Sequence, residues 1–233
     1  MTLYETIYAR RSVRQYDKTP LDETALSDIK TYLENAEQAF GQAARFEIVG
    51  NEELKGGFAP HAILSSADDS DLAYLNIGYT LQGVDLYLQS IGYGSIWCGM
   101  AKPKAAKADY RILLGFGKTD VPLRDGERDF KRKKITDISN EDNPVARAAR
   151  LAPSAVNFQP WKLHFDDGLV TVKSNVRGLG KVLPGKLYLF DLGIVLKHVE
   201  LALEHEGKEV SPFKLENKGS AAEISVYFSK KIV

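Results

Sequence analysis

The chain repeats part of its own sequence at a distance of 115 residues, about half of its 233-residue length. Residues 72–92 align without gaps with residues 187–207, and 7 of the 21 positions are identical. The identical pairs are Leu72/Leu187, Gly78/Gly193, Leu81/Leu196, Val84/Val199, Leu86/Leu201, Leu88/Leu203 and Gly92/Gly207. Any two apolar helices share leucines, but the two matched glycines favour a true duplication. We therefore expect two copies of one structural unit.

The same offset aligns two further pairs of segments. Arg45–Val49 (RFEIV) falls over Pro160–His164 (PWKLH), and Arg111–Gly117 (RILLGFG) falls over Val226–Ile232 (VYFSKKI). We therefore divide the chain into a first half, residues 1–138, and a second half, residues 139–233, which pack as one unit.

Hydrophobic periodicity and turn residues predict an α+β fold. The expected helices cover Thr2–Ala9, a segment after the N-cap Asp22, Asp71–Ile91 and Leu187–Glu206. The expected strands are Arg45–Gly50, His61–Ser66, Arg111–Gly117, and the two arms of a hairpin around Asp167–Gly168. The two long helices are apolar on nearly all sides, which predicts that they pack against each other as the shared core of the halves. The order of elements predicts a sandwich of helices against a mostly antiparallel sheet.

Composition narrows the range of functions. Basic and acidic side chains number 31 each, so a protein that coats nucleic acid is not expected. Cys98 is the only cysteine, which excludes an intramolecular disulfide and a cysteine-rich metal site. The four histidines are His61, His164, His198 and His205. None of them has the spacing of an HExxH metal-binding motif, so surface or core histidines are favoured over a metal site. With neither an apolar leader nor a stretch of about 20 apolar residues, we expect a cytoplasmic protein with no membrane partner.

Two segments have no equivalent in the other half. The first is Arg10–Arg14 (RRSVR), whose counterpart Asp125–Asp129 (DGERD) has the opposite charge character. Three guanidinium groups and a hydroxyl suit a phosphate monoester dianion. A solvated basic end of a short helix is the alternative.

The second segment is Leu151–Trp161 (LAPSAVNFQPW), whose counterpart Ala36–Phe46 lacks both prolines, the serine and the asparagine. Prolines stiffen this backbone, and three polar side chains lie close together in the sequence. Such a loop suits the polar edge of a planar heterocycle. A polar turn between a helix and a strand is the alternative.

Taken together, RRSVRQY and APSAVNFQPW resemble the FMN-dependent nitroreductase family. Three more stretches are similar to that family: Gly78–Met100, Arg111–Gly117 and the basic segment Phe130–Ile138. The resemblance covers most of residues 1–138 and residues 144–166. Ordinary members are homodimers with each flavin between two subunits, and their proline–serine–asparagine loop precedes the first strand.

Here that loop lies about 115 residues later than in the ordinary family. The chain therefore resembles a subgroup in which one duplicated chain is built like the family homodimer. This resemblance implies a nitroreductase-like sandwich with one complete flavin site and one erased site. Such a chain can exist as a monomer.

The resemblance also assigns site residues. The phosphate and ribityl end of FMN would be held by Arg10, Arg11, Ser12 and Arg14, helped by Lys131, Arg132 or Lys133. The flavin ring would meet Pro153, Ser154, Asn157 and Gln159 of the loop, and Trp97, Cys98, Gly99 and Met100 near N5. Cys98 is expected to be a small buried side chain rather than a redox group.

The implied function is that of an FMN-dependent oxidoreductase. Hydride would pass from NAD(P)H through FMN to a nitroaromatic, a quinone or a similar small-molecule acceptor, with no catalytic side chain required because the flavin carries the chemistry. No nicotinamide-binding motif selects NADH over NADPH. Two alternatives stay open: a flavin-binding protein without turnover, and a cofactor-free degenerate member.

Overall fold

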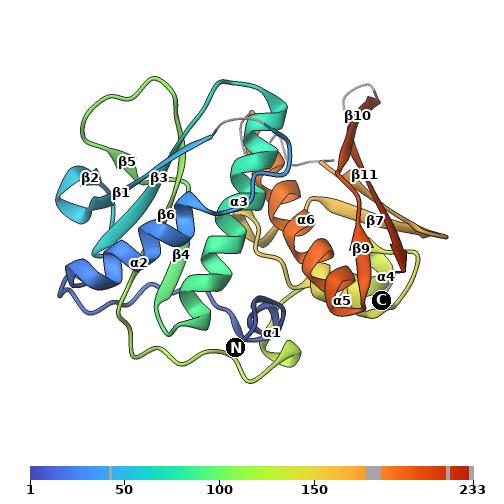
Figure 1. Ribbon diagram of the computed structural model, residues 1–233, viewed down its shortest axis with the longest axis horizontal. Coiled ribbons are helices and arrows are strands. Elements are labelled where there is room, and N and C mark those ends of the chain that lie inside the picture. Colours follow the sequence, from blue (N-terminus) through green and yellow to red (C-terminus); the bar gives the residue numbers. More distant parts are fainter. Residues whose placement is uncertain (42–43, 177–184, 219–220, 231–233) are drawn as a thin grey trace.

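The computed structural model describes residues 1–41, 44–176, 185–218 and 221–230. Two antiparallel sheets stand on either side of a central pair of long helices, α3 (Asp71–Ser90) and α6 (Tyr188–His205), which lie side by side in Figure 1. The expected α+β architecture is confirmed. Every paired strand in the described residues is antiparallel, and the helix pair lies between the four-stranded and the five-stranded sheet.

The first half begins with a short helix whose start is set by a capping box between Thr2 and Glu5. Asp22 caps the second helix, as its sequence predicts, and Ser70 caps the third. The elements before and after α3 are α1 (Leu3–Ala9), α2 (Glu23–Glu34), β1 (Arg45–Gly50), β2 (Leu54–Lys55), β3 (His61–Ser66), β4 (Gly94–Cys98), β5 (Lys102–Pro103) and β6 (Tyr110–Gly117).

The second half uses the same kinds of element. Gly168 has a φ of 68° in the tight turn of the predicted hairpin, a conformation that glycine adopts at little cost. Helix α4 (Ile135–Ile138) ends the first half. The elements around α6 are α5 (Pro144–Arg150), β7 (Trp161–Asp166), β8 (Leu169–Ser174), β9 (Lys208–Val210), β10 (Lys214–Lys218) and β11 (Ala221–Lys230). The last residues of the predicted repeat match, 231 and 232, lie outside the described residues.

The strand orders of the two sheets correspond. The first sheet runs β1-β3-β6-β4; the second pairs β7 with β8, β8 with β11 and β11 with β9, and adds β10 beside β11. At the repeat offset β1 falls on β7, β6 on β11 and β4 on β9. The hairpin at 167–168 replaces the longer β1–β3 connection, which moves β8 earlier in the second half.

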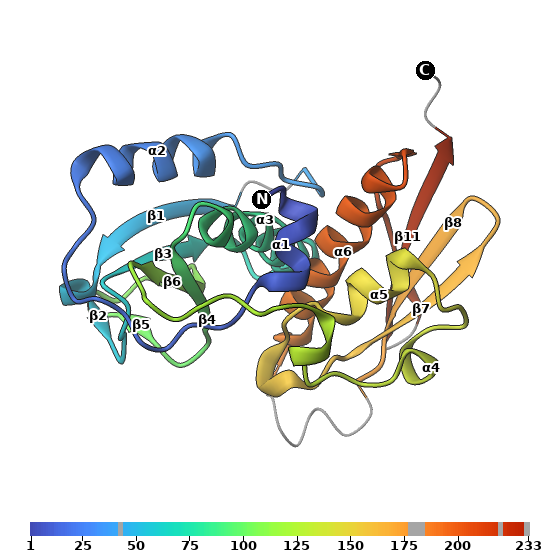
Figure 2. The same ribbon diagram turned by 90° about the horizontal axis from the view of Figure 1, so that it is seen from below.

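The apolar core is divided between the two layers. One buried cluster joins α2 and α3 to the first sheet, and another joins α1, α5 and α6 to the second. Ile7 and Phe130, both from the first half, belong to the second cluster. Phe130 lies on the segment between β6 and α4, which crosses from one sheet to the other in Figure 2. Residues from both sides of position 138 therefore share one apolar cluster. Within the described residues, no helix is long and apolar enough to cross a bilayer.

Candidate active site

Arg10 is the most deeply buried charged side chain of the predicted phosphate segment, with 1% of its surface exposed. Its Nε donates to Asp85 Oδ2 on α3 at 2.8 Å, and Asp85 is fully buried. Its Nη2 is shielded from solvent and has no hydrogen-bond partner among the described residues. A buried guanidinium nitrogen without an acceptor is unusual, and it is available to an anion.

The rest of the RRSVR segment is fixed by its main chain. Ser12 forms a parallel bridge with Ser95 of β4, and the N–H of Val13 donates to the Ser95 oxygen at 3.0 Å. The N–H of Arg11 donates to Gln89 Oε1 at 2.8 Å. This register leaves the Arg11 side chain half-buried and the Arg14 side chain exposed. The segment therefore extends the first sheet beyond its edge strand.

Arg132 is the basic residue of the 131–133 stretch that turns toward the site. Its Nη1 donates to Asn157 Oδ1 at 2.7 Å and its Nη2 donates to the Leu151 oxygen at 3.0 Å. Lys131 is exposed, and its main-chain oxygen accepts from Asn157 Nδ2 at 2.9 Å. Lys133 donates to the Gln159 oxygen at 3.0 Å. The structure thus brings the basic stretch and the polar loop together.

A cluster of arginines surrounds Phe130. The guanidinium carbons of Arg124 and Arg132 lie 4.3 Å and 5.4 Å from the centre of its ring. Burial, with the nearby positive charges of Arg10, Arg124 and Arg150, lowers the pKa of Arg132 to about 9. Burial and the charges of Arg10 and Arg11 lower the pKa of Arg124 to about 10. These cations repel one another, so the cluster favours binding of an anion.

Sequence reasoning missed Arg124 and Arg150. Arg124 donates to the main-chain oxygen of Arg10, and its own N–H donates to the Ala9 oxygen at 2.7 Å. Arg150 closes the last turn of α5 and donates to Glu127 Oε1 at 2.7 Å. Neither lies in a motif: Arg124 reaches the site because the 118–134 segment crosses from one sheet to the other, and Arg150 reaches it at the end of α5.

The polar loop after α5 has a strained backbone. Val156, Asn157 and Gln159 have φ values of 46°, 58° and 51°, which non-glycine residues rarely adopt. Val156 is β-branched and 68% exposed, so local packing does not explain its conformation. Strain of this kind concentrates at ligand-binding loops. The sequence offered no signal for Val156.

Internal hydrogen bonds hold the loop in this shape. Gln159 is 2% exposed; its N–H donates to Ser154 Oγ at 2.9 Å, and its Oε1 accepts from the Lys133 N–H at 2.9 Å. Gln159 therefore fastens the loop to the basic stretch, whereas Asn157 is exposed. Pro153 is buried at the start of the loop.

A buried carboxyl lies under the loop. Asp191 on α6 accepts from the Ala155 N–H at 3.0 Å through Oδ1, while its Oδ2 has no hydrogen-bond partner in the described part of the chain. Burial raises the pKa of Asp191 to about 7, and the Ala155 hydrogen bond opposes that rise. The carboxyl is thus held close to the boundary between its neutral and charged forms.

The Trp97–Met100 stretch begins on β4 and ends in the loop after it. Trp97 Nε1 donates to Gln82 Oε1 of α3 at 3.2 Å. Cys98 is buried, and this burial raises the pKa of its thiol to about 11, as suits the expected small packing side chain. Gly99 and Met100 are exposed.

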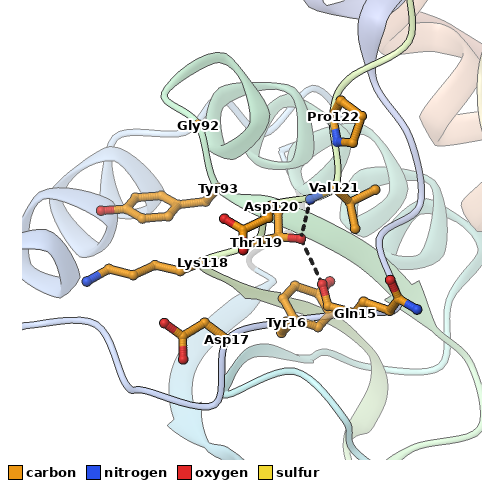
Figure 3. A pocket seen from close by; sticks show the side chains of 10 residues that line it. All are labelled: Gln15, Tyr16, Asp17, Gly92, Tyr93, Lys118, Thr119, Asp120, Val121 and Pro122. Carbon is orange, nitrogen blue, oxygen red and sulfur yellow. Dashed lines mark hydrogen bonds between the residues drawn. The ribbon is translucent and has the colours of Figure 1, made fainter.

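Two open pockets lie near these segments. One, of about 840 Å³, is lined by basic residues that include Arg132, Lys133 and Arg150, by Phe130, and by the acidic residues Asp125, Glu127 and Asp129. The other, of about 780 Å³, lies at the far end of β6 and is drawn in Figure 3. There Thr119 Oγ1 donates to the Gln15 oxygen, and charged side chains of both signs line the wall. None of the predicted site residues lines that second pocket.

The histidines are in separate environments. His198 is buried on α6, and His205 stacks on Tyr4 with ring centres 3.9 Å apart. Over the described ranges, no group of three or more histidine, cysteine or acidic side chains is placed to hold a metal ion.

Comparisons with known proteins agree with the fold. The family described as "Putative TM nitroreductase" matches residues 2–203. The chain is similar to the solved structure of a "putative nitroreductase" from Thermotoga maritima, with a TM-score of 0.72, 22% identity and coverage of 97% of this chain and 94% of that one. No curated protein matches the sequence.

Two shorter neighbours were also found among solved structures. A "Putative NADH dehydrogenase/NAD(P)H nitroreductase" from Bacteroides thetaiotaomicron has a TM-score of 0.46 and 16% identity over 61% of this chain and 99% of that chain. A nitroreductase with bound FMN from Desulfitobacterium hafniense has a TM-score of 0.42 and 16% identity over 57% and 100%. Because the family match extends over most of the sequence, the chain belongs to the nitroreductase family described as "Putative TM nitroreductase", and the nitroreductase-like fold expected from the sequence is confirmed.

Proposed function

We propose that this chain is an FMN-dependent oxidoreductase of the nitroreductase type with one flavin site built from both halves. One observation carries the proposal: Arg10 at the start of the chain and Arg132 beside the loop at 154–159 are close enough to repel each other. Each also has a solvent-shielded guanidinium nitrogen with no partner among the described residues. These two segments are the ones that the other half lacks.

The donor set fits the phosphate end of FMN. A phosphate monoester carries close to two negative charges and three acceptor oxygens. Arg10 Nη2 and Arg132 Nε supply donors without acceptors among the described residues, and the pKa of Arg132 is lowered first by burial and then by repulsion from the nearby positive charges. Binding of a dianion would remove this repulsion and satisfy both nitrogens. Arg124 would add a third positive charge.

The loop at 154–159 would meet the flavin ring. Asp191 and Lys133 fix its backbone from below and from one side, so the exposed Val156 and Asn157 keep their places without a ligand. A preformed loop binds a planar ring with little loss of conformational entropy. Trp97 and the main chain up to Met100 would face the ring from the first half.

The redox chemistry in this proposal is that of FMN, with transfer of a hydride from NAD(P)H to a nitroaromatic, a quinone or a similar small acceptor. The side chains described above bind and orient. Cys98, with its raised pKa, is kept as an unreactive thiol. No nucleic-acid or membrane partner is part of the proposal, and the cytoplasm is the proposed compartment.

The place equivalent to the site in the other half is closed. Glu37, Glu200 and Phe213 line a small pocket of about 180 Å³ there. Phe213, the counterpart of Cys98, packs on the rings of Phe40 and Tyr79 at 5.8 Å and 5.6 Å. An aromatic side chain thus stands where the proposed site has the small side chain of Cys98. We therefore expect one flavin per chain.

A repeated hydrogen bond supports the proposed duplication of halves 1–138 and 139–233. The Ala155 N–H donates to Asp191 Oδ1 at 3.0 Å, and the Phe40 N–H points to Asn76 Oδ1 at 3.5 Å. Ala155 lies 115 residues after Phe40, and Asp191 lies 115 residues after Asn76. Two unrelated halves have no reason to share this contact.

The test is the visible absorption spectrum of the purified protein after loading with FMN and desalting. We expect a flavin-to-chain ratio near one, reduced in both Arg10→Ala and Asn157→Ala, which change different halves. The exposed Arg45→Ala is the control, and it should leave the ratio unchanged. A ratio near two would contradict the closed second site. If no flavin binds under any loading condition, the protein is a cofactor-free member of the family and the proposal is wrong.

Turnover is tested separately. Steady-state NAD(P)H oxidation by the loaded protein should require a nitroaromatic or quinone acceptor. Retention of flavin without any such oxidation would overturn the oxidoreductase proposal in favour of a flavin-binding protein.

A further inference from the structure

Gln82 lies at the centre of a buried hydrogen-bond network between the two halves. It is on α3 and is fully buried. Its Nε2 lies 3.1 Å from Asp85 Oδ2 and 3.2 Å from His198 Nε2, and its Oε1 accepts from Trp97 Nε1 at 3.2 Å. Asp85 in turn holds Arg10. One amide therefore connects three elements around the proposed site.

The direction of each hydrogen bond follows from the chemistry of His198. Its Nδ1 lies 3.0 Å from the Ala148 oxygen, which can only accept, so the proton is on Nδ1. Burial lowers the pKa of His198 to about 3, which keeps the ring neutral and leaves Nε2 as an acceptor. Gln82 must then donate one amide proton to His198 and the other to Asp85. A flipped amide would place its oxygen against two acceptors.

The hydrogen-bond network ends on α5, the helix that leads into the loop at 154–159. Ala148 lies in the middle of α5, and the strained loop follows the end of that helix. Gln82 therefore connects Arg10 and Trp97, which would meet the ligand in the proposed site, to α5, which leads into the loop at 154–159. Gln89 and Ser95 extend the network by donating to Asp85 Oδ1 at 3.1 Å and 2.6 Å.

The repeat shows that burial alone does not require this arrangement. The counterpart of Gln82 is Lys197, and that of Asp85 is Glu200; these two form a direct ion pair at 2.6 Å, with the Tyr79 hydroxyl donating to Glu200. The counterpart of Trp97 is Pro212, which has no side-chain donor. The neutral amide of Gln82, with its three partners, therefore lies beside the proposed flavin site. The Lys197–Glu200 ion pair lies at the equivalent, closed position of the other half.

We propose that Gln82 is a positioning residue that sets the geometry of the flavin site by tying Arg10 and Trp97 to helix α5. The inference rests on the proposed FMN function, which it extends to a residue outside the first ligand contacts. Gln82 itself does not touch the ligand. Its effect is transmitted through Asp85, Trp97 and His198.

The test uses Gln82→Met, which keeps the length of the side chain and removes its polar atoms. We expect the dissociation constant for FMN to rise at least tenfold. We also expect the indole N–H resonance of Trp97 to shift in the ligand-free protein. The chain has only two tryptophans, Trp97 and Trp161, so the two indole signals can be assigned by one Trp97→Phe variant. His198→Phe cuts the same network from the second half and should also weaken FMN binding.

Tyr79→Phe is the matched control. Tyr79 is as deeply buried on the same helix, but its hydroxyl belongs to the closed position. It should leave FMN binding and the Trp97 resonance unchanged. Equal FMN affinity in wild type and Gln82→Met would overturn this inference and leave the proposed function standing. The same would follow if Tyr79→Phe lost as much FMN affinity as Gln82→Met. Failure of the wild type to bind FMN would overturn the proposed function and this inference with it.

Discussion

Gly78 and Gly193 meet at the crossing of α3 and α6. A Cβ on Gly78 would lie 2.2 Å from the main-chain oxygen of Phe190, and a Cβ on Gly193 would lie 2.0 Å from that of Leu75. Both distances are far below van der Waals contact, so the helix backbones touch directly. One of the two matched glycine pairs of the sequence repeat, Gly78/Gly193, therefore lies where the main chains of α3 and α6 are in contact.

Gly78→Ala and Gly193→Ala should each destabilise the protein. The added methyl group would meet main-chain atoms of the partner helix, which can only yield by moving the helices apart. We expect a loss of about 1–3 kcal/mol or more in the free energy of unfolding. Denaturant unfolding curves measure this loss. Gly83→Ala, on the same helix, is the control, because its Cβ would meet only the flexible Lys197 Cε at 3.3 Å. It should be neutral or gain about 0.5–1 kcal/mol from the higher helix propensity of alanine.

Arg132→Gln should weaken FMN binding about tenfold or more, because one charge-assisted hydrogen bond contributes roughly 1.5–3 kcal/mol. Riboflavin, which lacks the phosphate, should lose much less affinity. Fluorescence titration with both ligands measures the difference. Lys131→Gln is the neighbouring control, since Lys131 takes part in the loop contact only through its main-chain oxygen. An equal loss for both ligands would place Arg132 at the ring rather than at the phosphate.

Much of the fold could be predicted from local patterns. The capping residues Thr2, Asp22 and Ser70, the apolar helices and the hairpin at 167–168 all follow rules that act within a few residues. The repeat added long-range information, because segments at matched positions of a repeat are expected to pack in related ways. It predicted that the two long helices form the shared core.

The site could be predicted only as a set of segments. Arg132 was not distinguishable from Lys131 and Lys133, because their stretch is neither helix nor strand and has no period to define a face. Arg124 belongs to no motif, and it reaches the site because its segment passes from one sheet to the other. The positive φ values at Val156, Asn157 and Gln159 accompany hydrogen bonds of the loop to Lys133 and Asp191, which lie far from it along the chain and belong to no local pattern.

Val156→Asn should stabilise the protein by about 0.5–1 kcal/mol, because asparagine tolerates positive φ and valine does not. The Val156 side chain is 68% exposed, so little packing is lost. Thermal and denaturant unfolding give the change. Val156→Thr keeps the β-branch and should gain nothing. A loss of stability in Val156→Asn would mean that the valine side chain makes contacts that outweigh its backbone strain.

Asp191 should make the stability of the protein depend on pH between about 4 and about 7. Its carboxyl has a pKa near 3.9 in the unfolded chain and about 7 in the folded one. The folded state therefore binds more protons in this interval, so the free energy of unfolding falls as the pH rises through it. The stabilisation is fully present below pH 4 and is lost once the pH passes about 7.

Asp191→Asn should remove this dependence. The amide oxygen can still accept from the Ala155 N–H, as the equivalent Asn76 does from the Phe40 N–H at a longer distance. Relative to the variant, the wild type should lose on the order of a few kcal/mol between pH 4 and pH 7.5. Unfolding curves at pH 4, 5.5 and 7.5 measure the difference, and Asp167→Asn on the exposed hairpin controls for the loss of a surface carboxyl. Parallel wild-type and Asp191→Asn profiles would show that the Asp191 carboxyl is solvated in the folded protein, and the loop above it would then lack the buried support described here.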